Sequence, residues 1–309
     1  MRKTTISLFC IFLLSSCIKE IPLDETSFSP RLVVNSVVCP DSIIKVQISK
    51  TVLITDTGKR VINNANVSLY KEGVFVSQLA NIDSGYYVFG IYPEKGKLYE
   101  IKADAPGYNP VSATEVIPEK TEILSCSFKG PIAAIDPTIG DEMGDINIVF
   151  KDNAYVKNYY EVVFYWLKNG IKDYISIHNV YQDIPVLKNE GDIDYEPSSI
   201  FFSDELFNGK EYSLNIKMYM PFSRSGNNWE IIEPHGKLYV ILRTTSYNYY
   251  KYRKLWTRHR HNQNQGLDYY QDLFRGEPIT MFTNVTNGNG IFAGYSQDVK
   301  EAPFILIRK

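Results

Sequence analysis

Residues 43–51 read IIKVQISKT, a stretch in which Val46 and Ile48 alternate with polar residues. Alternation with a period of two is typical of a half-buried β-strand, because successive side chains of a strand point to opposite faces of the sheet. Similar short runs follow along the chain, separated by Gly, Pro, Asn and Asp. Several short strands with turn residues between them predict a β-sandwich.

The same pattern occurs in a second set of runs, so we expect a mainly β protein with two β-sandwich-like domains and one helix near the C-terminal region. One run, from Tyr160 to Leu167, is apolar almost throughout, which predicts burial on both of its faces. Residues 128–145 have the Gly, Pro and Asp density of a long loop. The predicted strands are 31–39, 43–51, 65–70, 73–79, 86–91 and 98–103, followed by 146–150, 159–167, 174–178, 211–220, 237–244 and 304–307.

The first 16 residues have the pattern of a signal peptide. Arg2 and Lys3 precede an apolar run, residues 6–14, that is shorter than the roughly 20 residues needed to cross a bilayer. The following Leu14-Ser15-Ser16-Cys17 matches a lipobox, in which the cysteine sulfur receives the lipid. We therefore expect cleavage after residue 16 and a membrane anchor on Cys17. The alternative is an ordinary signal peptide with an incidental cysteine.

Composition sets further limits on the mature chain. The formal net charge of the sequence is −2, which argues against nucleic acid as a partner, since nucleic-acid binding needs a basic surface. We expect residues 17–30 to form a tether, residues 31–118 a first β-sandwich, and residues 119–309 a second β-rich domain. Pro118 is the expected hinge.

Two cysteines, Cys39 and Cys126, remain after Cys10 leaves with the signal peptide and Cys17 is lipidated. In an oxidising compartment leftover cysteines often pair. A disulfide here would tie the start of the first domain to the beginning of the second. The alternative is two buried thiols.

One helix is predicted at about 246–263, with Ser246 as its N-cap. Tyr249, Tyr252, Leu255 and Trp256 lie on one stripe of this helix, which should face the second sandwich. Exposed Tyr and Arg are residue types that anchor protein interfaces. The expected partner-binding residues on the other faces are Tyr247, Tyr250, Arg253, Arg258 and Arg260.

Catalytic and metal-binding patterns were also sought. His259 and His261 lie two residues apart on the predicted helix, so they point in different directions and cannot share a metal. The sequence contains no Gly-x-Ser-x-Gly, His-Glu-x-x-His or P-loop motif. We therefore expect no catalytic residues, no metal and no cofactor.

Two resemblances add to these expectations. The segments 64–67, 84–87, 98–101 and 105–108, which include Gly85-Tyr86 and Pro106-Gly107-Tyr108, resemble the carboxypeptidase regulatory-like β-sandwich. In that module glycine permits positive φ at the turns and tyrosine packs into the sandwich. The resemblance implies that this domain is a structural scaffold with no catalytic activity.

The second resemblance rests mainly on residues 276–285 and on Asn287-Gly288-Asn289-Gly290-Ile291-Phe292-Ala293-Gly294-Tyr295. Together with the Tyr-rich helix before it, this segment resembles a family of outer-membrane lipoproteins of Bacteroidetes-type bacteria. That family is described as a domain of unknown function in the 4000s series. The genes of that family often neighbour TonB-dependent transporters. From the residues alone, this segment either packs structurally around the turn pair Asn287-Gly288 or forms a ligand-contacting loop.

The leading functional hypothesis is a non-catalytic lipoprotein, accessory to a TonB-dependent transporter in ligand binding or complex assembly. The alternatives are a cell-surface hydrolase that acts on glycans or peptides and a structural adhesin. Lys19-Glu20 partly matches a surface-export tag, which favours the cell-surface side of the outer membrane and leaves the periplasmic side open.

Cys17→Ser should leave the mature chain without lipid and release it into the soluble fraction, because no later segment of the sequence reaches the apolar length of a membrane span. Membrane fractionation and the mass of the N-terminal peptide check this outcome. Wild-type protein that stays in the membrane with no acyl mass on its first peptide would contradict it.

Overall fold

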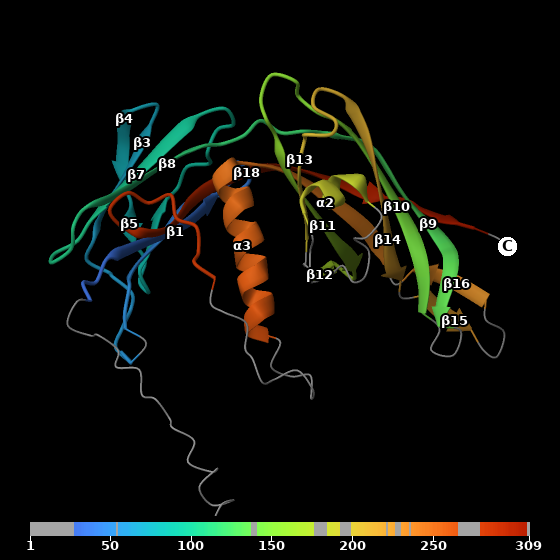
Figure 1. The fold of residues 1–309 in the computed structure, drawn as a ribbon, viewed down its shortest axis with the longest axis horizontal. Coiled ribbons are helices and arrows are strands. Elements are labelled where there is room, and N and C mark those ends of the chain that lie inside the picture. The colour runs from blue at the N-terminus through green and yellow to red at the C-terminus, as the bar shows by residue number, and fades with distance from the viewer. Residues whose placement is uncertain are drawn as a thin grey trace, which may run out of the picture.

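The computed structural model describes residues 28–53, 55–136, 141–175, 184–191, 199–220, 222–225, 230–234, 236–264 and 279–307. The signal peptide, Cys17 and nearly all of the tether lie outside these residues. Within them the chain is mainly β and folds into two sandwiches with helix α3 (Tyr247–Asn264) between them (Figure 1), as the sequence predicted. None of the helices in the described part is long and apolar enough to cross a membrane.

The first sandwich packs strands β1, β2, β6 and β5 against the sheet β4-β3-β7-β8. Alternation along β2 buries Ile44, Val46 and Ile48 at its core, which confirms the strand predicted from residues 43–51. The strands are β1 (Leu32–Val38), β2 (Ile44–Lys50), β3 (Asn66–Lys71), β4 (Val74–Gln78), β5 (Ala80–Asn81), β6 (Tyr86–Phe89), β7 (Leu98–Asp104) and β8 (Val111–Val116).

The second sandwich packs β12, β11, β17 and β13 against the sheet β14-β10-β9-β19. Residues Tyr160 to Trp166 of β11 are all buried, so the prediction of burial on both faces is confirmed. Its strands are β9 (Ile123–Asp136), β10 (Asp141–Lys151), β11 (Tyr159–Lys168), β12 (Ile171–Tyr174), β13 (Ile200–Ser203), β14 (Glu211–Met220), β17 (Lys237–Thr245) and β19 (Phe304–Leu306). Strands β15 (Phe222–Ser225) and β16 (Glu230–Pro234) form a separate hairpin, and α2 (Pro185–Asn189) is a short second helix.

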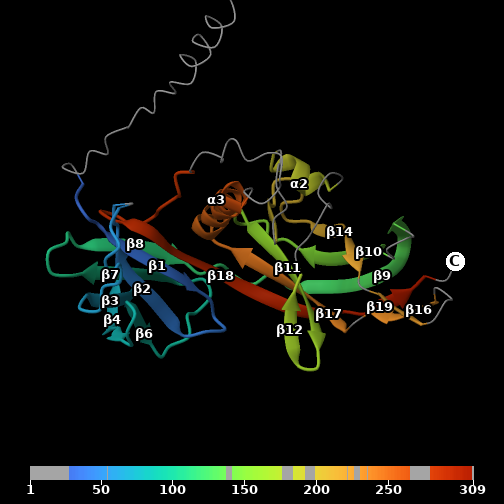
Figure 2. The ribbon, with the colours of Figure 1, turned by 90° about the horizontal axis from the view of Figure 1, so that it is seen from below.

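Strand β18 (Asn289–Ala302) belongs to both sandwiches. Its first half pairs in parallel with β1, from Val33↔Asn289 to Val38↔Gly294, and its second half pairs antiparallel with β17. Figure 2 shows β18 running from the lobe of β1 into the lobe of β17. The predicted boundary at residue 118 stays a prediction, but the C-terminal part of the chain supplies a strand to the N-terminal sandwich.

The loop predicted for residues 128–145 is wrong for residues 128–136 and 141–145, because β9 and β10 pair there, and residues 137–140 lie outside the described residues. The pairing shifts between Met143↔Ala133 and Asp145↔Lys129, so Gly130 and Pro131 fall in an irregular part of the ladder. Such bulges accommodate glycine and proline within a strand. In the described part, Gly130 and Pro131 therefore marked an irregularity in an antiparallel strand pair rather than a loop.

The expected disulfide is also wrong, since Cys39 and Cys126 are both free thiols. Cys39 follows Val38, which pairs with Gly294, whereas the Cys126 thiol donates to the carbonyl oxygen of Glu301 at 3.1 Å. Positions 294 and 301 of β18 are about 23 Å apart at the usual rise of a strand. A disulfide requires Cα atoms within about 7 Å, so the two thiols cannot meet. Cys39 is buried, as the alternative expected, but Cys126 is only partly buried.

Gly290→Ala should destabilise the protein by at least about 2 kcal/mol, because Gly290 has a φ of +104° and a Cβ there would lie 2.1 Å from the carbonyl oxygen of Val34. Gly90→Ala is the matched control, since nothing lies within 4 Å of its Cβ position. Urea denaturation measures both. Equal stability of the two variants would contradict the close approach of β18 to β1.

Candidate functional site at helix α3

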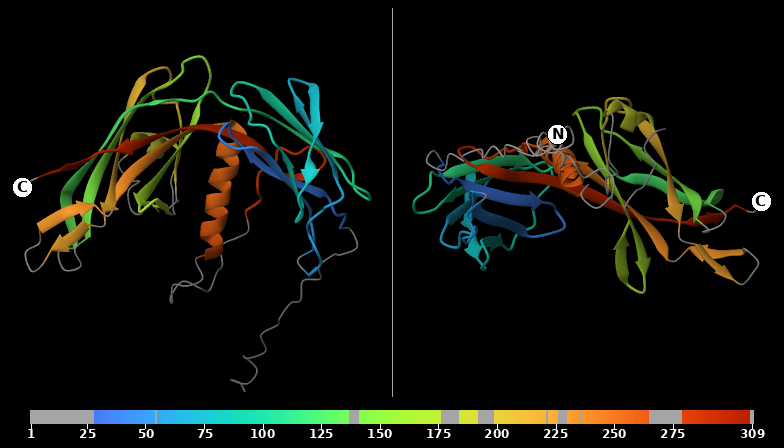
Figure 3. Two further views of the ribbon diagram at one scale, coloured as in Figure 1. Left: turned by 180° about the vertical axis from the view of Figure 1, so that it is seen from behind. Right: turned by 60° about the horizontal axis from the view of Figure 1, so that its bottom comes forward.

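Helix α3 begins where β17 ends, and Ser246 fixes its start. The Ser246 Oγ accepts a hydrogen bond from the Tyr249 N–H at 3.2 Å, so the predicted N-cap is confirmed. The Ser246 N–H donates to the carbonyl oxygen of Gly294 at 2.9 Å. The N-terminus of the helix is thereby attached to β18 at the junction between the sandwiches, as Figure 3 shows from two further directions.

A buried carboxylate, Glu161 of β11, lies beneath the first half of α3. Its side chain is fully buried and accepts hydrogen bonds from Arg243 at 2.7 Å, Tyr249 at 2.7 Å and Ser199 at 2.8 Å. Arg253 of α3 approaches it at 3.4 Å. Burial by itself raises the pKa of Glu161, but the two guanidinium groups and these hydrogen bonds hold the pKa below its ordinary value. Glu161 is therefore an ionised anchor for the helix.

Arg253 was expected on the exposed surface, and this expectation is wrong. Besides Glu161, its guanidinium lies 4.9 Å from the ring centre of Trp256 and 5.7 Å from that of Phe201. The stripe that buries α3 is correspondingly narrower than predicted: Tyr249 is buried, whereas Tyr252, Leu255 and Trp256 are only half-buried. A helical wheel shows which residues share a face of a helix. It cannot show that a carboxylate from another strand, here Glu161, lies against that face.

A second carboxylate, Glu190, binds two side chains on the neighbouring face of α3. Lys254 donates to it at 2.6 Å, the Tyr250 hydroxyl donates to the same oxygen, and the Ser203 N–H donates to the other at 2.7 Å. Burial raises the pKa of Glu190, and the hydrogen bonds from Lys254 and Tyr250 outweigh that effect and lower it. The Tyr250 ring also packs on Tyr159, 4.7 Å between centres. Tyr250, like Arg253, therefore faces inward rather than toward a partner.

Three of the five expected interface residues keep an outward position. Tyr247 is 50% exposed, and Arg258 and Arg260 are both exposed. Arg260 lies 5.4 Å from the ring centre of Trp256, which holds it along the helix. Tyr247, Arg258 and Arg260, the exposed residues of this set, are called the outer face of α3 below, although Arg258 and Arg260 are two residues apart and point in different directions.

A third buried carboxylate, Glu115 of β8, was missed by the sequence reasoning. It accepts hydrogen bonds from Ser246 at 2.7 Å and Asn248 at 3.1 Å, at the N-terminus of α3. Burial raises the pKa of Glu115 to about 7 against these bonds. The available signal was its position, because Val111, Ala113 and Glu115 occupy the inward face of one strand. A charge at an inward position marks a specific contact, here between the two sandwiches.

The chemistry of this region is that of ion pairing and anchoring. Among the residues that the structure describes, no group of three His, Cys, Asp or Glu side chains could hold a metal ion. His259 lies on α3 and is partly buried, whereas the side chain of His261 lies outside the described set.

The model of a family described as a domain of unknown function (DUF4249) matches residues 18–301. This range includes α3, all of β18 but its last residue, and every other strand of the two sandwiches except β19. No curated protein matches the chain.

Glu115→Gln should change how stability depends on pH. Because the native state raises the pKa of this carboxyl from 4.5 to about 7, its protonated form contributes stability below pH about 4.5, and that contribution is lost as the pH rises to about 7. The variant cannot ionise, so relative to the wild type it should gain about 3 kcal/mol between pH 4 and pH 8. Urea denaturation of both proteins across this range checks the gain. A constant difference between them would contradict the buried position of Glu115.

Proposed function

This chain belongs to the family described as a domain of unknown function (DUF4249), and on that premise we propose that it is a non-catalytic lipoprotein that contacts a protein partner through the outer face of α3. The proposal is carried by the observation that two cations of the helix form buried ion pairs whereas two others are exposed. Arg253 and Lys254 pair with buried carboxylates, while Arg258 and Arg260 remain exposed.

The internal pairs orient the helix, so the residues of the outer face leave it in fixed directions. Ordered Arg and Tyr side chains lose little conformational entropy when they enter an interface. Each exposed guanidinium group favours an acidic partner surface, because it bonds a carboxylate in a planar, bidentate arrangement. The proposed partner surface therefore carries Asp or Glu opposite Arg258 and Arg260.

We propose a TonB-dependent transporter of the outer membrane as the partner and Cys17 as the lipid anchor. The lipobox Leu14-Ser15-Ser16-Cys17 supports the anchor. The transporter is supported by the resemblance to Bacteroidetes-type lipoproteins, whose genes neighbour such transporters. The partial tag Lys19-Glu20 favours the cell-surface side.

We also propose that the first sandwich is of the carboxypeptidase regulatory-like type. Gly85 and Gly107 have φ of +72° and +84°, in agreement with the turns of that module. Tyr87 is 1% exposed, and its hydroxyl accepts from the Ala65 N–H and donates to the carbonyl oxygen of Ile62. Of the two tyrosines on which the resemblance rests, Tyr86 is half-buried and Tyr108 packs, partly buried, against the core of the first sandwich.

The double variant Arg258→Glu, Arg260→Glu should keep the thermal stability of the wild type, because exposed substitutions of this kind change stability by about 0.5 kcal/mol or less. It should recover severalfold less transporter when the tagged lipoprotein is purified from solubilised outer membranes. Lys95→Glu, Lys97→Glu is the control, since both lysines are exposed and the charge change is the same. Equal transporter recovery with the two double variants would refute the interface.

A further inference from the structure

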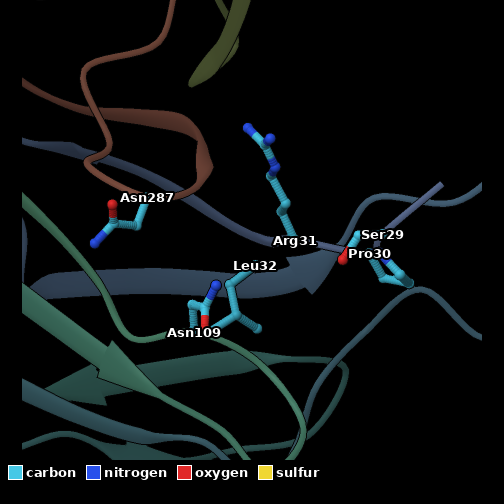
Figure 4. A pocket seen from close by; sticks show the side chains of 6 residues that line it. All are labelled: Ser29, Pro30, Arg31, Leu32, Asn109 and Asn287. Carbon is cyan, nitrogen blue, oxygen red and sulfur yellow. The ribbon is translucent and has the colours of Figure 1, made fainter. Parts of the chain in front are cut away.

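A cavity of about 290 Å³ opens at the start of β1 (Figure 4). Three segments that are far apart in the sequence line it: the entry to β1, the loop between β7 and β8, and the turn before β18. The lining residues are Ser29, Pro30, Arg31, Leu32, Asn109 and Asn287.

The wall that carries Asn287 is set by close backbone packing. Asn287 has a φ of +60°, a left-handed conformation that asparagine adopts more readily than most residues. The next residue, Gly288, packs so closely that a Cβ would lie 2.7 Å from the carbonyl oxygen of Leu32. Before the turn, Thr286 and Ser112 exchange backbone hydrogen bonds of 2.8 and 3.4 Å. The position of the Asn287 side chain is thus fixed by the fold.

The opposite wall is also held in place. The Arg31 N–H donates to the Thr51 Oγ1 at 2.9 Å, and the Thr51 N–H donates to the carbonyl oxygen of Arg31 at 2.9 Å. These bonds occupy the backbone of Arg31 and leave its guanidinium available.

The polar side chains around the cavity have no bonding partners within the described part of the chain. This holds for the side chains of Arg31, Asn109 and Asn287, which Figure 4 shows around the cavity. Arg31 offers a fork of donors, and each amide offers both a donor and an acceptor. Pro30 and Leu32 supply apolar contact beside them. Polar side chains beside a partly apolar wall are a usual composition of a small-molecule site.

We propose that this cavity binds a small, hydroxyl-rich molecule that carries one carboxylate, of the class of acidic monosaccharides. Arg31 would bond the carboxylate in bidentate fashion, and Asn109 and Asn287 would each pair with a hydroxyl as donor and acceptor. Among the described residues of the lining, Arg31 is the only charged one, so a monoanion matches it better than a phosphate dianion does. The small volume excludes a long oligosaccharide from full enclosure. This site is separate from the outer face of α3 and does not depend on it.

Isothermal titration of the mature, unlipidated chain with glucuronate, with glucose as the uncharged comparison, tests the proposal. Glucuronate should bind at least about tenfold more tightly than glucose, and Arg31→Gln should remove that difference, since one bidentate charged contact is worth about a factor of ten or more. Asn287→Gly should weaken glucuronate binding severalfold while permitting the same left-handed backbone. Lys151→Gln, a substitution of an exposed cation in the second sandwich, should leave binding unchanged.

Other outcomes would overturn the proposal. Failure of both glucuronate and galacturonate to bind at millimolar concentration would exclude an acidic monosaccharide. Binding that survives Arg31→Gln would place the ligand elsewhere on the molecule. If inorganic phosphate displaced glucuronate as effectively as unlabelled glucuronate does, the cavity would be a general anion site rather than a sugar site.

Discussion

Strand β18 takes part in two sandwiches at once, and the placement of the other elements follows from it. Its first half completes the sheet of β1, and its second half completes the sheet of β17. A continuous hydrogen-bonded strand resists bending far more than a flexible linker does, so the two lobes are joined as a unit. Gly290 and Gly294 permit this strand to lie close to its neighbours, since a Cβ at Gly294 would lie 2.7 Å from the side chain of Ile117.

At the junction that β18 creates, buried carboxylates lie beside a small apolar cluster that contains Phe201, Tyr249, Ile291 and Ala293. Glu115 binds the helix start from the first sandwich, while Glu161 and Glu190 bind its side chains from the second. A buried carboxylate is costly unless a cation or several donors surround it, so it accepts few alternative arrangements of its neighbours. We infer that these three groups favour a single orientation of α3. The orientation of α3 in turn sets the directions in which its exposed arginines, Arg258 and Arg260, leave the helix.

Local sequence pattern predicted the parts of the fold that depend on neighbouring residues. Period-two alternation located β2, the run of residues 211–220 corresponds to β14, and Ser246 marked the start of α3. Pairings between distant segments carried no such signal. The parallel pairing of β18 with β1 and the contact between Glu161 and Arg253 join residues that are far apart in the chain. For the same reason Arg253 was placed on the wrong side of the helix, and Asn109 was not associated with Asn287 before the cavity brought them together.

The shared strand also constrains the order in which the chain can fold. During synthesis, residues 31–118 leave the ribosome long before residues 289–302 do. Until then β1 lacks one of its two neighbours, and the edge that it presents is a template for unwanted pairing. Completion of the sheet of β1 therefore requires β18, and pairing between strands so far apart in the sequence is intrinsically slow. A product truncated before β18 would lose structure in both lobes, although it would keep most of the residues of each.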